Sequence, residues 1–112
     1  MLFGAAGVID ALAAFFPKTV VRLMVLSREA STGSAGAEVL AEARKLQYVV
    51  SKAEEFIGKF GVVGIKEAVF RVTGLGTLEG GRLPLKGRLA DGEWEKWRAQ
   101  LLTDIEKTEA EL

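Results

Sequence analysis

The chain has 112 residues, and its 15 Lys and Arg are balanced by 15 Asp and Glu, so the formal net charge is zero. This balance argues against a general nucleic-acid binder, whose affinity comes mainly from neutralising phosphates. The chain has no Cys and no His, which excludes disulfides, zinc sites with thiolate or imidazole ligands, and Ser–His or Cys–His relays. Hydrophobic residues make up 49% of the sequence, which is typical of one domain with a buried core.

The first 17 residues are mostly apolar. Met1–Phe3 is either the end of a buried strand or a frayed terminus. Gly4–Gly7 is a turn, and we expect a helix from Val8 to Phe16 that Pro17 ends. The segment fits neither a membrane-spanning helix nor a signal peptide, because an acidic residue interrupts the apolar run and no basic stretch precedes it.

Two helices are predicted in the next part of the chain. The first runs from Lys18 to about Ala30, and its buried stripe is expected to be Val20, Leu23, Met24 and Ser27. After a Ser- and Gly-containing loop, Ser34 is a candidate N-cap. The second helix runs to Gly61, which ends it. Its apolar residues recur in steps of four and three: Val39, Ala43, Leu46, Val50, Ala53, Ile57 and Phe60.

Two further helices are predicted towards the C-terminus. Val62–Thr73 is expected to be helical, with Gly74 as its C-cap and with Val62, Ile65, Val69 and Val72 in phase. Leu75–Ala90 is irregular. Asp91 can cap the last helix, whose apolar stripe is Trp94, Trp97, Leu101 and Ile105. Glu106–Leu112 is polar and expected to fray. The fold is therefore predicted to be mainly α, with at most one strand.

Two features could carry chemistry. Gly4–Gly7, placed before a helix, could cradle a phosphate or carboxylate, because helix N-termini attract anions; a plain tight turn is the favoured alternative. Lys66 lies between hydrophobic residues, and a desolvated lysine can act as a Schiff-base nucleophile. We favour a surface lysine with a buried stem, because the sequence shows no partner that would lower its pKa.

The acidic pairs and the tryptophans are expected to be structural. Glu54–Glu55 and the pair of Glu93 with Glu95 have spacings at which helical side chains do not face each other, so they are interpreted as solvated. Trp94 and Trp97 could stack on a ligand, but their helical spacing favours packing into a core. No metal-ligating or cofactor-binding set is predicted.

Four segments, taken together and in order, resemble the dihydrodipicolinate synthase / N-acetylneuraminate lyase family. The first resembles the family's Gly-x-x-Gly-(Val/Ile)-Ile pattern at the last strand and following helix, although Ala14 stands where the family has Asn. The second is similar to an Ala-x-x-Leu-Gln helix, the third to a Gly-(Ile/Val)-x-(Gly/Ala)-(Leu/Val)-Lys segment, and the fourth to a Gly-Leu … Arg-x-Pro-Leu stretch. The segments are residues 4–17, 42–47, 60–68, and 74–75 with 80–85.

The resemblance implies that the chain is the C-terminal fragment of an α/β TIM barrel, comprising the last strand and the terminal helices. Residues 1–30 would be the last barrel strand and following helices, and residues 31–112 the C-terminal helical region of the same domain. The family is a group of Schiff-base lyases, or aldolases, acting on pyruvate and related 2-oxo acids without a metal or organic cofactor. Its catalytic lysine and tyrosine would lie upstream, so the fragment is expected to be inactive alone.

The resemblance therefore assigns no catalytic residue in this chain. It places one segment at the C-terminal mouth of the barrel, where its backbone would line the substrate cavity. These expected cavity-lining residues are Gly4, Ala5, Ala6, Gly7 and Val8. Among the members, the chain leans slightly towards the 4-hydroxy-2-oxoglutarate aldolases.

Other expectations concern partners and location. The full-length family takes a small 2-oxo acid, whereas neither nucleic acid nor membrane is an expected partner. One strand cannot close a barrel, so exposed apolar faces should favour self-association. The expected location is the cytoplasm, with mitochondria as the alternative for full-length relatives. A free-standing helical protein-interaction module is the alternative function.

Overall fold

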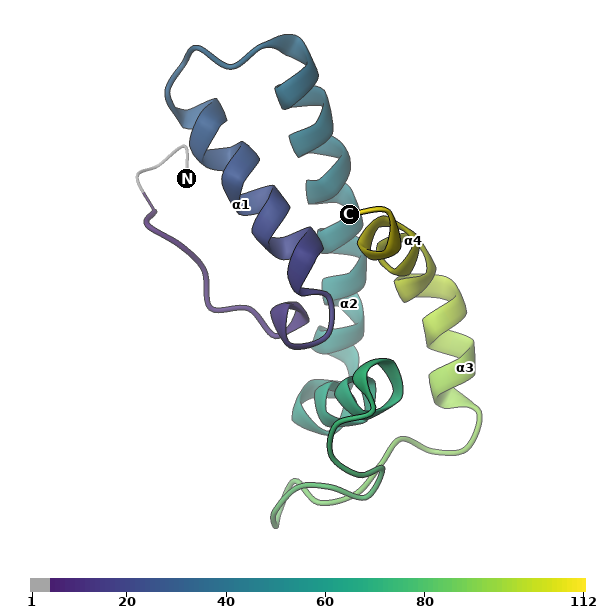
Figure 1. Cartoon of the computed structure of the whole chain (residues 1–112). Helices are drawn as coiled ribbons and strands as arrows, with labels where there is room; N and C mark the ends of the chain where they lie inside the picture. Colours follow the sequence, from purple (N-terminus) through teal and green to yellow (C-terminus); the bar gives the residue numbers. More distant parts are fainter. Residues whose placement is uncertain (1–4) are drawn as a thin grey trace.

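The computed structural model describes residues 5–112, in which every regular element is helical (Figure 1). The predicted mainly α architecture is thus confirmed for this part of the chain. The possible strand at Met1–Phe3 and the first turn residue, Gly4, lie outside the described residues. The elements in order are η1 (Leu12–Ala14), α1 (Pro17–Ser31), α2 (Ala37–Thr73), α3 (Glu93–Trp97), η2 (Arg98–Leu102) and α4 (Thr103–Glu111).

The helix predicted from Val8 to Phe16 is wrong except for η1, a single 3₁₀ turn. The Asp10 carboxylate accepts the Leu12 N–H at 2.7 Å, so the side chain supplies a local alternative to a helical bond. Phe16 is also forced out of the helical region by the ring of Pro17. The residues left between these two constraints are too few to nucleate a stable helix.

Helix α1 begins at Pro17, one residue before the predicted start, because proline suits the first helical position. The Glu109 carboxylate of α4 accepts the backbone N–H groups of Lys18 and Thr19 at 2.9 and 2.7 Å, and also the Thr19 hydroxyl at 2.7 Å. A residue 90 positions away therefore caps this helix. The fully buried residues of α1 are Thr19 and Leu26, and the predicted stripe beside them is only half-buried.

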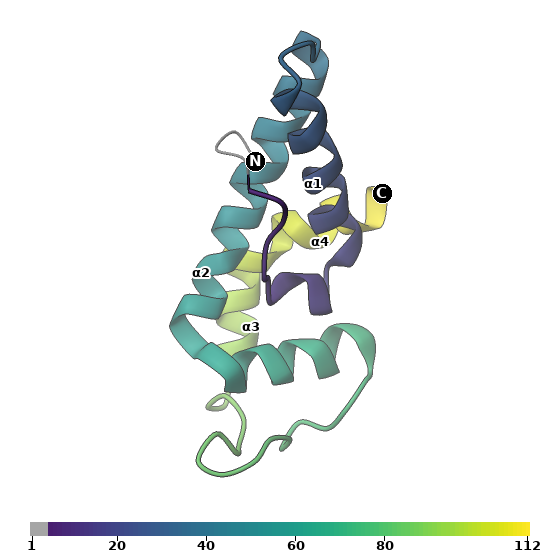
Figure 2. The same cartoon turned by 90° about the vertical axis from the view of Figure 1, so that its left-hand side faces the viewer.

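Helix α2 lies beside α1 over its first half and then bends sharply (Figures 1 and 2). The bend is at Gly61, whose φ of 58° and ψ of −147° are not helical, so the prediction that Gly61 ends the first segment is confirmed. A side chain is disfavoured in this region of the backbone map. Gly64 is also required, because a Cβ there would lie 2.3 Å from the Phe60 Cβ.

Replacing Gly61 with alanine is expected to destabilise the fold by about 1–3 kcal/mol, the usual cost of a strained backbone conformation. A Cβ at this position would meet nothing within 4 Å, so the cost would come from the backbone alone. Gly58→Ala is the matched control: it also enters open space, but within regular helix, and should stabilise by about 0.5–1 kcal/mol. Urea denaturation measures both, and equal effects of the two substitutions would contradict the assignment.

The predicted apolar stripe before Gly61 is confirmed, since Leu46, Val50 and Ala53 are buried and the other members are half-buried. After the bend, the predicted stripe is partly wrong, because Val62 and Val72 are exposed. The bend turns the second segment so that other residues face inward: Gly64, Glu67 and Ala68. Gly74 adopts φ 75° and donates its N–H to the Phe70 carbonyl at 2.8 Å, which confirms it as the C-cap.

Two predicted N-caps are wrong. Helix α2 begins after Gly36 without a side-chain cap, and the Ser34 hydroxyl instead lies 2.8 Å from the Thr32 hydroxyl. Helix α3 begins after Gly92, and Asp91 instead accepts a hydrogen bond from Arg88 at 3.2 Å. In both places the candidate cap bonds inside the preceding loop, so α2 starts two residues later than predicted and α3 starts one residue later.

The last helix is continuous through α3, η2 and α4. Its predicted stripe is confirmed, with Trp94, Leu101 and Ile105 buried and Trp97 half-buried. The η2 segment is a π-helical turn, and its extra residue brings Leu102 inward together with Leu101. The prediction that the chain frays from residue 106 onwards is wrong. The helix continues to residue 111, and Glu109 in its last turn accepts hydrogen bonds from the start of α1.

The core lies where η1, the middle of α2 and the last helix meet. Phe56 of α2 packs edge-on against Trp94, with ring centroids 5.7 Å apart and an interplanar angle of 88°. Phe15 and Phe16 join this cluster from the segment before α1. Within residues 5–112, no helix combines the length and the apolar character needed to cross a membrane.

Candidate functional site

The predicted cavity-lining segment is extended and exposed. Ala5, Ala6, Gly7 and Val8 all face solvent, Val8 with 72% of its surface, and Ile9 is fully exposed. Figure 2 shows this purple segment descending to η1 across α1 and α2. Within the described part of the chain, residues 5–10 form no backbone–backbone hydrogen bond. Because no helix begins at residue 8, the anion-cradle hypothesis lacks the helix N-terminus that it requires.

The segment covers a cavity of about 340 Å³ between itself, α1 and α2. It approaches α1 closely, since a Cβ built on Gly7 would lie 3.6 Å from Met24 Cε. The cavity wall is apolar on the α1 side and carries polar groups where the segment meets α2. The apolar lining is Val8, Ile9, Val20, Leu23, Met24 and Val50, and the polar lining is Asp10, Ser27, Gln47 and Glu54.

Two carboxyl groups, those of Asp10 and Glu54, share this cavity. Partial burial of Glu54, together with a hydrogen bond to Asp10 and the repulsion between their charges, raises the pKa of Glu54 to about 7. A protonated Glu54 can therefore donate a hydrogen bond to the Asp10 carboxylate near neutral pH. The prediction that Glu54 lies on a solvated face is therefore wrong, whereas its neighbour Glu55 is exposed.

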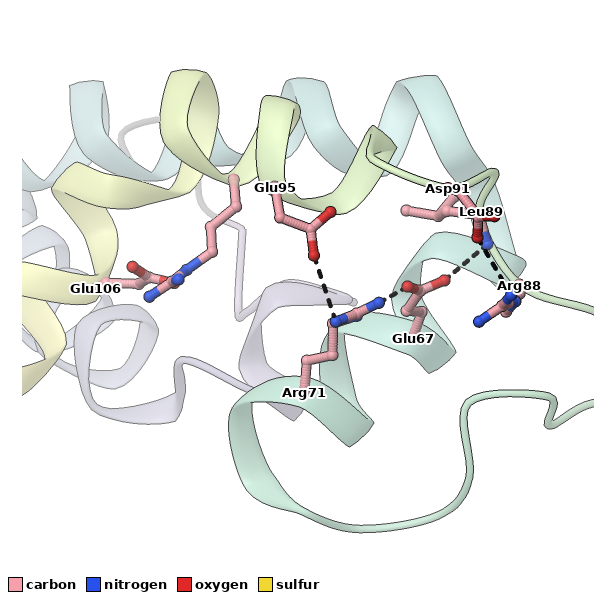
Figure 3. Close-up of polar contacts among 8 residues, drawn as sticks. Glu67, Arg71, Arg88, Leu89, Asp91, Glu95 and Glu106 are labelled. Atoms are coloured by element: carbon pink, nitrogen blue, oxygen red, sulfur yellow. Dashed lines mark hydrogen bonds and ion pairs between the residues drawn. The ribbon is translucent and has the colours of Figure 1, made fainter.

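A second carboxylate is buried at the other end of α2 (Figure 3). Glu67 is 2% exposed, and it accepts Arg71 Nε at 2.8 Å and the Leu89 N–H at 2.7 Å. Arg71 also lies 3.7 Å from the exposed Glu95 of α3. The arrangement ties the long 75–92 connection and α3 to α2, so we interpret Glu67 as structural. Nothing in the local sequence marks this role, because Leu89 is 22 residues away.

A wider hollow of about 780 Å³ lies between the start of α1, the end of α2 and the last helix. Phe15, Phe16, Phe70 and Trp94 line it, together with Lys18 and with four charged side chains that bond to other parts of the protein: Arg71, Arg98, Glu106 and Glu109. Arg98 pairs with Glu106 at 2.7 Å. These charges hold helices together and leave no evident ligand chemistry.

The other sequence candidates occupy structural positions. Lys66 is exposed on α2, as expected for a surface lysine whose charge lies in water. Trp94 is buried, and the Trp97 indole N–H donates to Glu93 at 2.9 Å, so Glu93 is an anchor for the ring. The Lys59 ammonium lies 4.1 Å from the Trp97 ring centroid. Among residues 5–112, no three His, Cys, Asp or Glu side chains lie close enough to hold a metal ion.

Comparisons with protein-family models, with curated proteins and with solved structures give no match to this chain. The functional argument therefore depends on the residues and on the geometry of the N-terminal segment.

Proposed function

We propose that this chain is the C-terminal part of a Schiff-base lyase barrel of the dihydrodipicolinate synthase / N-acetylneuraminate lyase type. In this role it contributes the last strand and the terminal helices, and it carries no catalytic group. The lysine that condenses with pyruvate or a related 2-oxo acid belongs to the part of the barrel that precedes residue 1. We place the complete lyase in the cytoplasm.

The observation that supports this proposal most is the exposed, extended segment from Ala5 to Ile9. An apolar stretch that has no backbone partner among residues 5–112 has the properties of a strand that has lost its neighbours. Its unpaired N–H and C=O groups and its apolar side chains are what an adjacent barrel strand would satisfy. Lys66, the one lysine weighed as a nucleophile, is exposed on a helix and lacks the dry surroundings that imine chemistry uses.

A free-standing helical interaction module is the second candidate, and the packing of the helices favours it. The core is continuous from η1 to α4, and the described residues leave no buried polar side-chain atom without a hydrogen-bond partner. The helices therefore form a body that needs no barrel to satisfy its buried polar side chains. Only the N-terminal segment distinguishes the two candidates.

The test is binding to a lyase barrel of this family that has been truncated before its last strand. The barrel-part proposal predicts a one-to-one complex by light scattering, and Ile9→Asp should weaken it at least tenfold because a charge would enter the strand pairing. Leu83→Asp is the matched control, since Leu83 is also apolar and 85% exposed but lies in the 75–92 connection. Equal binding by both variants would favour the interaction module. So would a monodisperse chain that forms no complex with the truncated barrel.

A further inference from the structure

We propose that residues 5–11 form a proton-controlled strap over the α1–α2 groove, closed when a protonated Glu54 donates a hydrogen bond to Asp10 and open when Glu54 is ionised. This inference goes beyond the proposed function, because it concerns how the segment sits on its own helices. It needs neither a barrel nor a substrate.

The first observation is that side chains, and not backbone pairing, hold the segment down. Residues 5–10 make no backbone–backbone hydrogen bond within the described chain, and most of their side chains face solvent. The contacts on the groove side are the approach of Gly7 to Met24 and the enclosure of the cavity by Val8, Ile9 and Asp10. A segment attached by so few contacts can open without unfolding the helices.

The second observation is the position of the carboxyl pair. Asp10 is at the end of the strap, next to the turn that it caps through the Leu12 N–H. Glu54 projects from α2 into the same cavity. A protonated Glu54 makes this contact attractive, whereas an ionised Glu54 repels the Asp10 carboxylate. The protonation state of Glu54 therefore decides whether the end of the strap next to η1 is attracted to α2 or repelled from it.

Among the described residues that line the cavity, none carries a positive charge that would neutralise the pair. Helix α1 contributes Val20, Leu23, Met24 and Ser27, and α2 contributes Gln47 and Val50 beside Glu54. Two cations of these helices pair away from the cavity, Arg22 with Glu42 at 2.7 Å and Lys52 with Asp104 at 2.6 Å. Within the part of the chain that the structure describes, Asp10 and Glu54 are the only charged residues that line the cavity.

The direction of the pH effect follows from the raised pKa. Glu54 has a pKa of about 7 with the strap closed and an ordinary value near 4.5 once it is open to water. The open form therefore binds fewer protons between these values, and the closed form loses stability as the pH rises. The proton stabilises the closed form fully below pH 4.5, and this stabilisation is lost as the pH rises through about 7. Between pH 6 and pH 8 the closed-to-open ratio should fall about tenfold.

The test uses a thiol beneath the strap. The chain has no Cys, so Met24→Cys introduces a single reporter against the strap, and Ala41→Cys places a reference thiol on the exposed face of α2. Reaction with 4,4′-dithiodipyridine is followed at about pH 6 and pH 8. The Met24→Cys rate divided by the Ala41→Cys rate should rise about tenfold, because the reference corrects for thiol ionisation. Leu23→Cys serves as a second reporter in the same cavity if the first disturbs the strap.

Two further substitutions test whether the rise of the thiol reaction rate with pH depends on Glu54. With Glu54→Gln, the neutral amide can donate to Asp10 at every pH, so the normalised rate should stay constant within about twofold. Glu55→Gln, on the adjacent exposed carboxylate, should leave the tenfold rise unchanged. A rate ratio in the parent chain that does not vary with pH, or an unchanged rise with Glu54→Gln, overturns the strap. Neither result bears on barrel binding, which is measured separately.

Discussion

Glu67→Ala is expected to destabilise the chain by about 2–4 kcal/mol, because it removes two hydrogen bonds to a buried carboxylate, one of them from the partly exposed Arg71. Two groups lose their acceptor: Arg71 Nε and the buried N–H of Leu89. Because Glu67 joins α2 to the connection before α3, the loss should loosen the 75–92 region as well. Urea denaturation gives the free energy of unfolding, and amide hydrogen exchange at Leu89 reports the local effect.

Two comparisons sharpen this prediction. Glu67→Gln keeps one carbonyl acceptor and should cost less, about 1–3 kcal/mol. Glu95→Ala is the matched control, because Glu95 also faces Arg71 but lies 3.7 Å away and is largely exposed, so its loss should cost less than about 1 kcal/mol. If Glu67→Ala and Glu95→Ala destabilise the chain equally, the hydrogen bonds of Glu67 do not stabilise the 75–92 connection.

Phe56→Ala is expected to cost about 3–5 kcal/mol, since it removes a fully buried aromatic ring and leaves a cavity. The ring contacts Trp94 of α3 edge-on and Phe60 at a centroid distance of 5.0 Å, so it joins the two longest helical parts of the chain. Near-ultraviolet circular dichroism should show a changed Trp94 environment, and chemical denaturation should give the stability loss.

The control for this substitution is Tyr48→Ala on the same helix. Tyr48 is an aromatic residue of similar size but is 67% exposed, so its removal should change stability by less than about 1 kcal/mol. A small effect of Phe56→Ala would mean that the helices are held together elsewhere, and it would contradict the position of the core.

Helical periodicity and glycine positions were sufficient to predict most of the architecture. The stripe from Val39 to Phe60 is a local property of one helix, and the ends at Gly61 and Gly74 depend on backbone geometry that only glycine adopts readily. These features require no knowledge of distant partners. The same applies to the tryptophan-containing face of the last helix.

The features that were missed depend on contacts between distant residues. Glu109 caps α1 from the far end of the chain, and Glu67 is buried because Leu89 folds back onto it. The candidate site was predicted only in part: the segment from Ala5 to Val8 was singled out, but its cover of a cavity was not. Glu54 was missed because its raised pKa arises from burial and from Asp10, 44 positions earlier, and no local spacing signals either of them.

The most direct test of the barrel proposal is pyruvate release from 4-hydroxy-2-oxoglutarate by the chain mixed with a lyase barrel truncated before its last strand. The proposal predicts turnover by the mixture and none by either component, because the imine-forming lysine and the closing strand lie on different polypeptides. Turnover by the purified chain alone would contradict it, as would a mixture that remains inactive although both components are folded.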